Sequence, residues 1–157
     1  MRDLSELNIN DGGRPVTREP PSAATVAAFE RALRLKIPEP LLALLRFSNG
    51  GHPELDSFNP NGVEDTNSFG INTFYCLTDD ENAPYSLWEA VRVWRPYIGE
   101  SGLRFAEDGG GNIVFLDLAA EPAPVKVCWH DENFRVGLMA STLEKFIDGL
   151  CLNPDYI

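Results

Sequence analysis

Apolar residues recur at helical spacing in four segments of the chain. The positions are Val26, Phe29 and Leu33; Leu41, Leu44 and Leu45; Leu87, Val91, Trp94 and Ile98; and Leu143, Phe146, Ile147 and Leu150. Spacings of three and four residues place side chains on one face of a helix, so each segment predicts an amphipathic helix. We expect the first helix to begin near Ser22 or Thr25.

Local signals predict where the other helices begin and end. The second helix should be entered through Pro38-Glu39-Pro40 and should stop near residues 47–48, because Asn49-Gly50-Gly51 accepts positive φ angles. The third should begin at about Pro84. The fourth follows a capping box, Ser141-Thr142-Leu143-Glu144, in which we expect Ser141 to be the N-cap.

Alternation with period two predicts the strands. Phe69, Ile71, Thr73, Tyr75 and Leu77 lie on one side of a single predicted strand. Three shorter candidates cover 103–106, 112–118 and 125–130, and the glycine run 109–111 favours a hairpin loop between the first two. The region 52–66 is rich in proline, glycine and asparagine, which predicts a long loop.

The order of these elements is helix, helix, strand, helix, three strands, helix. We therefore expect an α+β fold: a single domain with a mostly antiparallel sheet of about four to six strands, which the helices cover on one side. Residues 1–21 lack sustained periodicity and are predicted to form an N-terminal arm, so the domain should span 22–157.

Composition is that of an ordinary folded domain. The chain has 157 residues, of which 43% are hydrophobic and 24% charged. Its three cysteines, Cys76, Cys128 and Cys151, form no CxxC pair, which argues against a disulfide framework and against a zinc knuckle. The sequence shows neither a signal peptide nor a membrane span, so we expect a cytoplasmic protein.

Charge is unevenly distributed along the chain. The formal net charge is −11, with a pI near 4.5, which opposes direct binding to nucleic acid. No Lys or Arg occurs from Phe47 to Val91, whereas acidic residues stand at Glu54, Asp56, Glu64, Asp65, Asp79, Asp80, Glu81 and Glu89. Two interpretations remain open: a solvated loop face, or a surface that steers a basic protein partner.

Catalytic and metal-binding patterns are weak. His130, Asp131 and Glu132 include groups that can act as acid, base or metal ligand, but neighbours on a strand face opposite sides and His52 is remote in sequence. Cys76 and Cys128 fall in predicted strands, where packing as small apolar residues is expected. We therefore expect no catalytic residue, metal or cofactor.

The tryptophans divide between core and surface. Trp94 and Trp129 follow the apolar patterns of their elements and are expected to pack in the core. Trp88 lies off the apolar stripe of its helix, so we expect partial exposure and a possible role as an aromatic anchor for a partner.

Several segments together resemble the SUKH superfamily. The segments 29–40 and 44–51 resemble its opening of two short helices that ends in Asn-Gly-Gly, and Phe105-Ala106-Glu107-Asp108-Gly109-Gly110-Gly111-Asn112 looks like its strand turn. The segments 125–131 and 139–147 are similar to its next strand and its last helix. The resemblance covers about Ser22 to Leu150, with the segments in the right order.

The resemblance implies a binding module of the Smi/Knr type. In bacteria such proteins are known mainly as immunity proteins that neutralise toxin domains, often nucleases, and fungal relatives act in cell-wall assembly and signalling. No catalytic residues are assigned across the family, and the matching positions look structural, as helix stop, hairpin turn and N-cap: Asn49, Gly50, Gly51, Gly110, Gly111, Asn112 and Ser141.

The leading hypothesis is a non-enzymatic protein that binds a toxin domain, which we expect to be basic. The alternatives are an intracellular regulator or scaffold and, less favoured, a small-ligand sensor or enzyme that uses His130, Asp131, Glu132 and Cys128. The predicted partner surface consists of Glu54, Asp56, Glu64, Asp65, Asp79, Asp80, Glu81 and Trp88. The sequence predicts no oligomeric state.

Overall fold

The computed structural model describes residues 1–10, 18–60 and 69–153. The helices are η1 (Leu4–Leu7, a 3₁₀ turn), α1 (Ala23–Leu33), α2 (Glu39–Phe47), α3 (Leu87–Ile98) and α4 (Leu143–Gly149). The strands are β1 (Ser57–Phe58), β2 (Phe69–Gly70), β3 (Thr73–Phe74), β4 (Gly102–Glu107), β5 (Ile113–Asp117), β6 (Val125–Trp129) and β7 (Arg135–Ala140). The predicted α+β class is confirmed.

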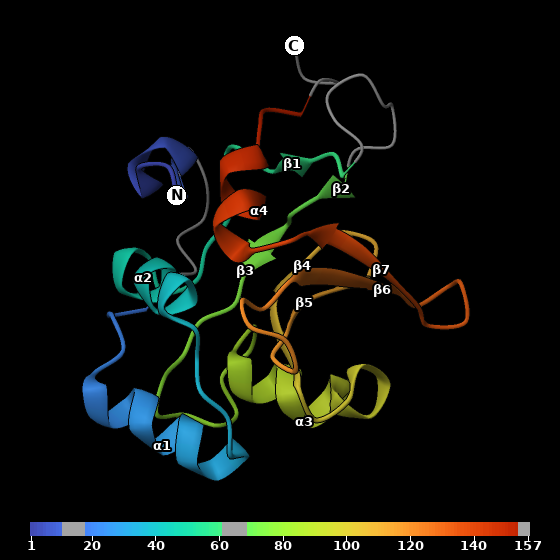
Figure 1. Ribbon diagram of the computed structural model, residues 1–157. Coiled ribbons are helices and arrows are strands. Elements are labelled where there is room, and N and C mark those ends of the chain that lie inside the picture. Colours follow the sequence, from blue (N-terminus) through green and yellow to red (C-terminus); the bar gives the residue numbers. More distant parts are fainter. Residues whose placement is uncertain (11–17, 61–68, 154–157) are drawn as a thin grey trace.

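The main sheet has five antiparallel strands in the order β3-β4-β5-β6-β7, and β1 pairs with β2 in a separate small sheet. Strands β4 to β7 follow one another as a meander, which the predicted hairpins anticipated in part. Figure 1 shows α3 below this sheet and α4 above it.

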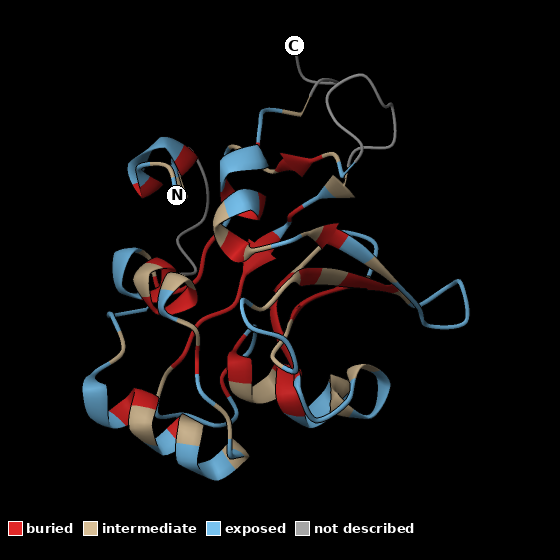
Figure 2. Ribbon diagram, viewed as in Figure 1, coloured by how far each residue is buried: buried red, intermediate tan, exposed pale blue. Residues whose placement is uncertain are grey.

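Both faces of the sheet are buried, and the expectation of helices on one side only is wrong. Phe105 points toward α4, where its ring meets that of Phe146 edge-on with centroids 5.9 Å apart. On the opposite face, Ile113, Phe115 and Cys128 pack with Trp94 and Ile98 of α3. Figure 2 shows the buried ribbon concentrated between the two helices.

The helix caps agree with the predicted segments and differ in detail. Ser22 and Ser86 each accept a hydrogen bond from the backbone N–H three residues on, so α1 begins where expected and α3 begins after Ser86 rather than at Pro84. In α4 the N-cap is Thr142, whose hydroxyl accepts from the Lys145 N–H; the prediction of Ser141 is wrong by one residue.

The predicted single strand over 69–77 is wrong. Residues 69–70 pair with β1, whereas residues 73–74 pair with β4 in the other sheet. β1 itself interrupts the loop expected over 52–66, of which residues 61–66 lie outside the described part of the chain. Alternation alone cannot show that a segment changes its pairing partner midway.

Strand β7 was missed because its pattern is irregular. Of its six residues only Met139 is buried, and Val136 and Leu138 are exposed although they are apolar. A strand that exposes apolar side chains gives no inside–outside alternation for sequence analysis to detect.

The N-terminal segment contributes to the core. Leu4 and Leu7 of η1 are buried in the main cluster, and the Arg2 guanidinium donates to the backbone oxygens of Asp148 and Leu150 at 2.8 and 3.0 Å. The division between an arm and a domain at residue 21 stays a prediction.

Leu7 provides a test of this packing. Its side chain is completely buried, so Leu7→Ala should lower the free energy of unfolding by about 2–5 kcal/mol in urea titrations. The exposed Leu152 is the matched control, for which Leu152→Ala should cost no more than about 0.5 kcal/mol. Equal stability of the two variants would show that η1 does not pack on the core in solution.

Candidate protein-binding surfaces

The five described acids of the predicted surface fall into two groups. Glu54 and Asp56 precede β1, whereas Asp79, Asp80 and Glu81 lie in the loop between β3 and α3. Figure 1 shows the first segment beside α4 and the second beside α1, at opposite ends of the molecule. Glu64 and Asp65 lie outside the described residues. The acids therefore form two separate surfaces rather than one.

Several of these carboxylates accept local hydrogen bonds. Glu54 accepts from Asn8 Nδ2 at 2.6 Å, and Asp79 accepts from the Thr25 hydroxyl at 2.7 Å. Asp80 accepts from the backbone N–H of Asn82 at 2.9 Å. The ion pairs between described residues involve none of the five acids, so their charge is available to act on a partner.

One cation comes closer to the second acidic group than the sequence suggested. Arg92 of α3 donates to the Glu81 carbonyl oxygen at 3.2 Å and to Asn82 Oδ1 at 3.4 Å. This guanidinium offsets part of the negative field of the 79–81 loop. In the described part of the chain, the side chains of Glu54 and Asp56 accept hydrogen bonds from Asn8 and Ser57, neither of which is a cation.

Trp88 is half-buried and makes two contacts within the chain. Its ring centroid lies 4.9 Å from that of Phe29 in an edge-on arrangement, and its Nε1 donates to the Thr78 carbonyl at 3.0 Å. These contacts join α1, α3 and the intervening loop. A role as a partner anchor stays a prediction, and it would have to use the part of the ring that these contacts leave exposed.

A buried arginine lies on the α3 face of the sheet. Arg104 is 3% exposed, and its guanidinium lies between the rings of Tyr75 and Trp94, at 5.1 and 4.8 Å from their centroids. Glu107 Oε2 lies 3.6 Å from Arg104 Nη2 and accepts from the Tyr75 hydroxyl at 3.0 Å. Sequence analysis missed this cluster, although an arginine inside the apolar run Leu-Arg-Phe-Ala was a signal.

Burial sets the protonation of this cluster. Desolvation raises the pKa of Tyr75 far above its usual range, so the phenol stays protonated and donates to Glu107. Desolvation also lowers the pKa of Arg104, an effect that the neighbouring Glu107 carboxylate opposes. The cluster is thus a satisfied ion pair within β4, joined by the Tyr75 hydroxyl to the segment after β3, rather than an exposed reactive group.

His130 is held by the glycine-rich turn. Asp108 accepts from the backbone N–H groups of Gly110 and Asn112 and from Asn112 Nδ2. Asn112 Oδ1 in turn accepts from the His130 backbone N–H and lies 3.0 Å from His130 Nδ1. An amide oxygen only accepts, so Nδ1 carries the proton.

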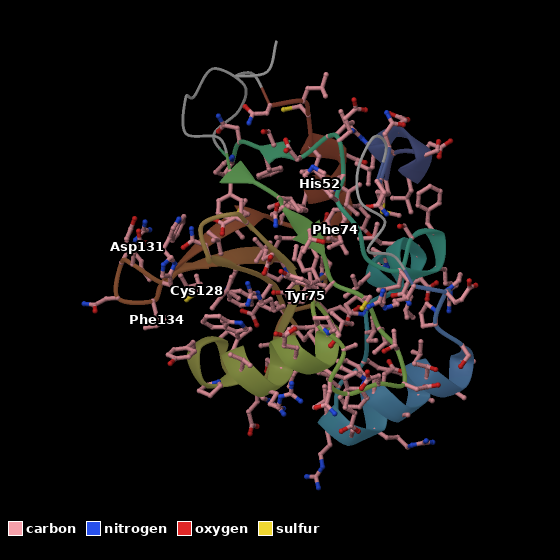
Figure 3. All side chains as sticks on the ribbon, turned by 180° about the vertical axis from the view of Figure 1, so that it is seen from behind. His52, Phe74, Tyr75, Cys128, Asp131 and Phe134 are labelled. Atoms are coloured by element: carbon pink, nitrogen blue, oxygen red, sulfur yellow. The ribbon has the colours of Figure 1, made fainter. Side chains whose placement is uncertain are left out.

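The remaining groups of the suggested acid–base site do not come together. Figure 3 shows Asp131 at the far end of the β6–β7 hairpin and His52 well separated from it. Within the described ranges, no three His, Cys, Asp or Glu side chains are placed to hold a metal ion. Cys76 and Cys128 are buried, as predicted.

A pocket of about 620 Å³ opens between the α1–α2 junction, the β5–β6 loop and the start of α4. Leu35, Leu116 and Leu143 contribute apolar surface, and the rim carries two cations and four carboxylates: Arg34, Lys36, Glu39, Glu100, Glu121 and Glu144. Such a lining can receive a partner side chain with an apolar stem and a charged end.

An exposed apolar surface lies at the other end of the sheet. We call it the β7 patch; it consists of Val93 and Tyr97 of α3, Phe134, and Val136 and Leu138 of β7. The rings of Tyr97 and Phe134 stack with centroids 4.2 Å apart and planes 16° from parallel. Sequence analysis missed this patch because it had not found β7.

Comparison with protein families now identifies the chain. The model for the SMI1 / KNR4 family (SUKH-1) matches residues 20–149. The chain belongs to this family. No curated protein matches the sequence. Within the described residues, no helix has the length and apolar character needed to cross a bilayer.

Two residues of the Asn-Gly-Gly motif have structural roles. The buried Asn49 side chain accepts from the Leu77 N–H and donates to the Leu77 carbonyl, both at 2.8 Å, as a neighbouring strand would. Gly51 has φ of 115°, and a Cβ there would lie 2.6 Å from Ile9. Asn49 therefore fixes the segment after β3, a larger role than the helix stop that the sequence suggested.

The Arg104–Glu107 pair yields a stability prediction. Glu107→Gln leaves the buried guanidinium without its counter-charge and should cost about 3 kcal/mol. The double variant Arg104→Met/Glu107→Gln should be more stable than Glu107→Gln alone, because neither charge remains buried. Urea unfolding measures the stability of both variants, and a double variant no more stable than Glu107→Gln would contradict this account.

Tyr75 yields a pH prediction. Its pKa is raised by burial, so above about pH 10 the unfolded chain loses a proton that the folded chain retains, and stability falls as pH rises. Tyr75→Phe should flatten this decline between about pH 9 and 11 in urea titrations. Tyr97→Phe, at an exposed position, is the control; the same slope in wild type and Tyr75→Phe would refute the assignment.

Proposed function

We propose that this protein is an immunity-type binding protein that associates with a toxin domain and neutralises it without catalysis. Membership of the SMI1/KNR4 family carries this proposal. Membership of this family is compatible with a protein-binding role. That the partner is a toxin is our inference. The association would take place in the cytoplasm, where a producing cell needs protection.

The charge of the chain supports a basic partner. The net charge is −11, and the acids of both surface groups lack ion pairs within the described residues. Such surfaces attract a cationic protein over distances of about 10 Å at moderate salt and raise its association rate. Toxins that cleave nucleic acid carry basic surfaces, because they bind a phosphate backbone.

The polar groups most suited to catalysis are engaged elsewhere, which supports a non-enzymatic role. Arg104 and Glu107 are paired with each other, and His130 is bonded to Asn112. Inhibition would then come from occlusion of the partner's active site. The alternative within the same family, an intracellular regulator or scaffold, would bind a cellular protein rather than a toxin.

Affinity capture followed by a growth assay distinguishes these roles. The tagged chain is incubated with lysate of its own cells at low salt, and the bound proteins are identified by mass spectrometry. A toxin partner must arrest growth when expressed alone and be tolerated when this chain is co-expressed. A captured protein that is harmless alone would favour the regulatory role and contradict the immunity proposal.

The acidic groups give a kinetic prediction. Reversing the charge of the 79–81 loop with Asp79→Lys/Asp80→Lys/Glu81→Lys should slow association with the basic partner about tenfold at low salt, with little change in dissociation rate. The difference should shrink in about 0.5 M salt, where screening is strong.

Two matched variants make this measurement specific. Asp79→Asn/Asp80→Asn/Glu81→Gln keeps the hydrogen-bond acceptors and should show a smaller loss of rate. Glu54→Lys/Asp56→Lys reports on the other acidic group. Unchanged association rates in all three variants, measured by surface plasmon resonance, would rule out steering by these acids.

A further inference from the structure

Strand β7 is the outermost strand of the main sheet. It follows β6 in the strand order, and no other strand of the described residues pairs with its outer edge. Among the described residues, no backbone hydrogen bond joins residues 136–140 to any segment other than β6. Figure 1 shows β7 unobscured at the end of the sheet, between the levels of α3 and α4. Unpaired N–H and C=O groups therefore point away from β6.

Apart from a register irregularity between the Leu138 and Ala140 pairs, this edge carries few of the features that keep monomeric proteins from pairing through their sheets. Edge strands are usually protected by lysine, proline, inward-pointing charges or a covering segment. The sequence of β7 from Val136 to Ala140 is Val-Gly-Leu-Met-Ala, which contains no charge and no proline. Its one charged residue, Arg135, stands at the start of the strand and is paired with Glu132 at 2.6 Å.

The side chains beside this edge form the β7 patch defined above. Leu138 is 62% exposed, and the other four members are between 38% and 48% exposed. Five large side chains that are about half exposed present roughly 400 Å² of apolar surface, the size at which patches on monomers are often functional. Val136 and Leu138 pair with Cys128 and Lys126 of β6, so their side chains lie on the same sheet face as Cys128. Helix α3 covers this face over β5 and β6, and leaves Val136 and Leu138 exposed.

The aromatic end of the patch is held in place by its backbone. Phe134 has φ of 56°, in the left-handed region that a bulky side chain rarely adopts. Its ring stacks on that of Tyr97, and Figure 3 shows Phe134 at the end of the hairpin. A strained residue that keeps an aromatic pair at the surface is typical of a binding surface prepared in advance.

We propose that the β7 patch binds a second copy of this chain, by antiparallel pairing of β7 with the same strand of the other copy. A two-fold axis at Gly137 places Val136 of each copy opposite Leu138 of the other, on the same face of a continuous ten-stranded sheet. Paired residues of antiparallel strands share a face, so these four side chains form one apolar cluster.

Charge favours a second copy over a basic partner at this surface. From Val136 to Ala140 the strand carries no charge, and the charges next to it on the ladder are paired, Lys126 with Asp117 and Arg135 with Glu132, each at 2.6 Å. The unpaired acids Glu54, Asp56 and Asp79 belong to other parts of the chain. These acids therefore attract a cationic protein elsewhere, and β7 beyond Arg135 is an uncharged apolar strand on a strongly acidic chain.

The two associations should respond oppositely to salt. Two copies with a charge of −11 each repel one another, so added salt should strengthen self-association through the apolar strand. Binding of a basic partner to the acids should weaken under the same conditions. The dimer does not depend on the proposed immunity function, and the sign of the salt effect separates the two.

Sedimentation velocity of the full chain tests the dimer. From about 1 to 300 μM protein, wild type should shift from monomer to dimer, and at about 0.5 M salt the shift should occur at lower concentration. Leu138→Lys and Val136→Lys should each raise the dissociation constant at least tenfold, because the two-fold axis brings each new charge into the apolar cluster twice.

Two controls exclude indirect effects. Phe47→Lys changes another exposed apolar residue, at the end of α2, and should leave the dimer unchanged. Circular dichroism and the urea midpoint should be unaltered in Leu138→Lys, since that side chain is exposed in the monomer. A wild type that stays monomeric at every concentration, or a dimer that neither β7 variant weakens, would overturn the proposal.

Discussion

The fold depends on the burial of the main sheet on both faces. Residues of β4 and β5 alternate between a side packed against α4, where Phe105 meets Phe146, and a side packed against α3, where Phe115 belongs to the cluster that Trp94 and Ile98 cover. A shift of one residue in register would exchange these two sets. Fixing the register of the central hairpin therefore fixes the positions of both helices, and through the edge-on contact of Trp88 with Phe29 it also positions α1.

Two-sided burial also explains the polar groups inside the structure. Arg104 lies on a covered face, so its charge requires the Glu107 carboxylate and the faces of two aromatic rings. Asn49 and Asn112 are used in a related way, since their amides satisfy backbone groups of the segment after β3 and of the β6–β7 turn. The polar residues of the interior thus stabilise strands and turns. Residues that could contact a partner are those at the surface.

The surface offers two kinds of contact with different physical character. The acids before β1 and after β3 act through a long-range field that salt screens, whereas the β7 patch acts only at contact, through apolar area and open backbone groups. Because these surfaces lie on different elements, a single chain can present both at once. Under the two proposals, recognition of a partner and self-association would use different elements of the chain.

The sequence by itself determined the four main helices, the hairpins of β4, β5 and β6, the α+β class and the packing of Cys76 and Cys128 in the core. These features are local, since periodicity, caps and glycine turns act within a few residues. Only the tertiary structure decided which faces of the sheet are covered, the division of 69–77 between two sheets, the separation of the acids into two groups and the enclosure of Arg104. Each of these depends on which distant segment lies alongside, as Leu77 lies against Asn49, and such pairings leave no trace in the spacing of neighbouring residues. Strand β7 was not predicted for a related reason: its exposed side chains show no pattern of burial.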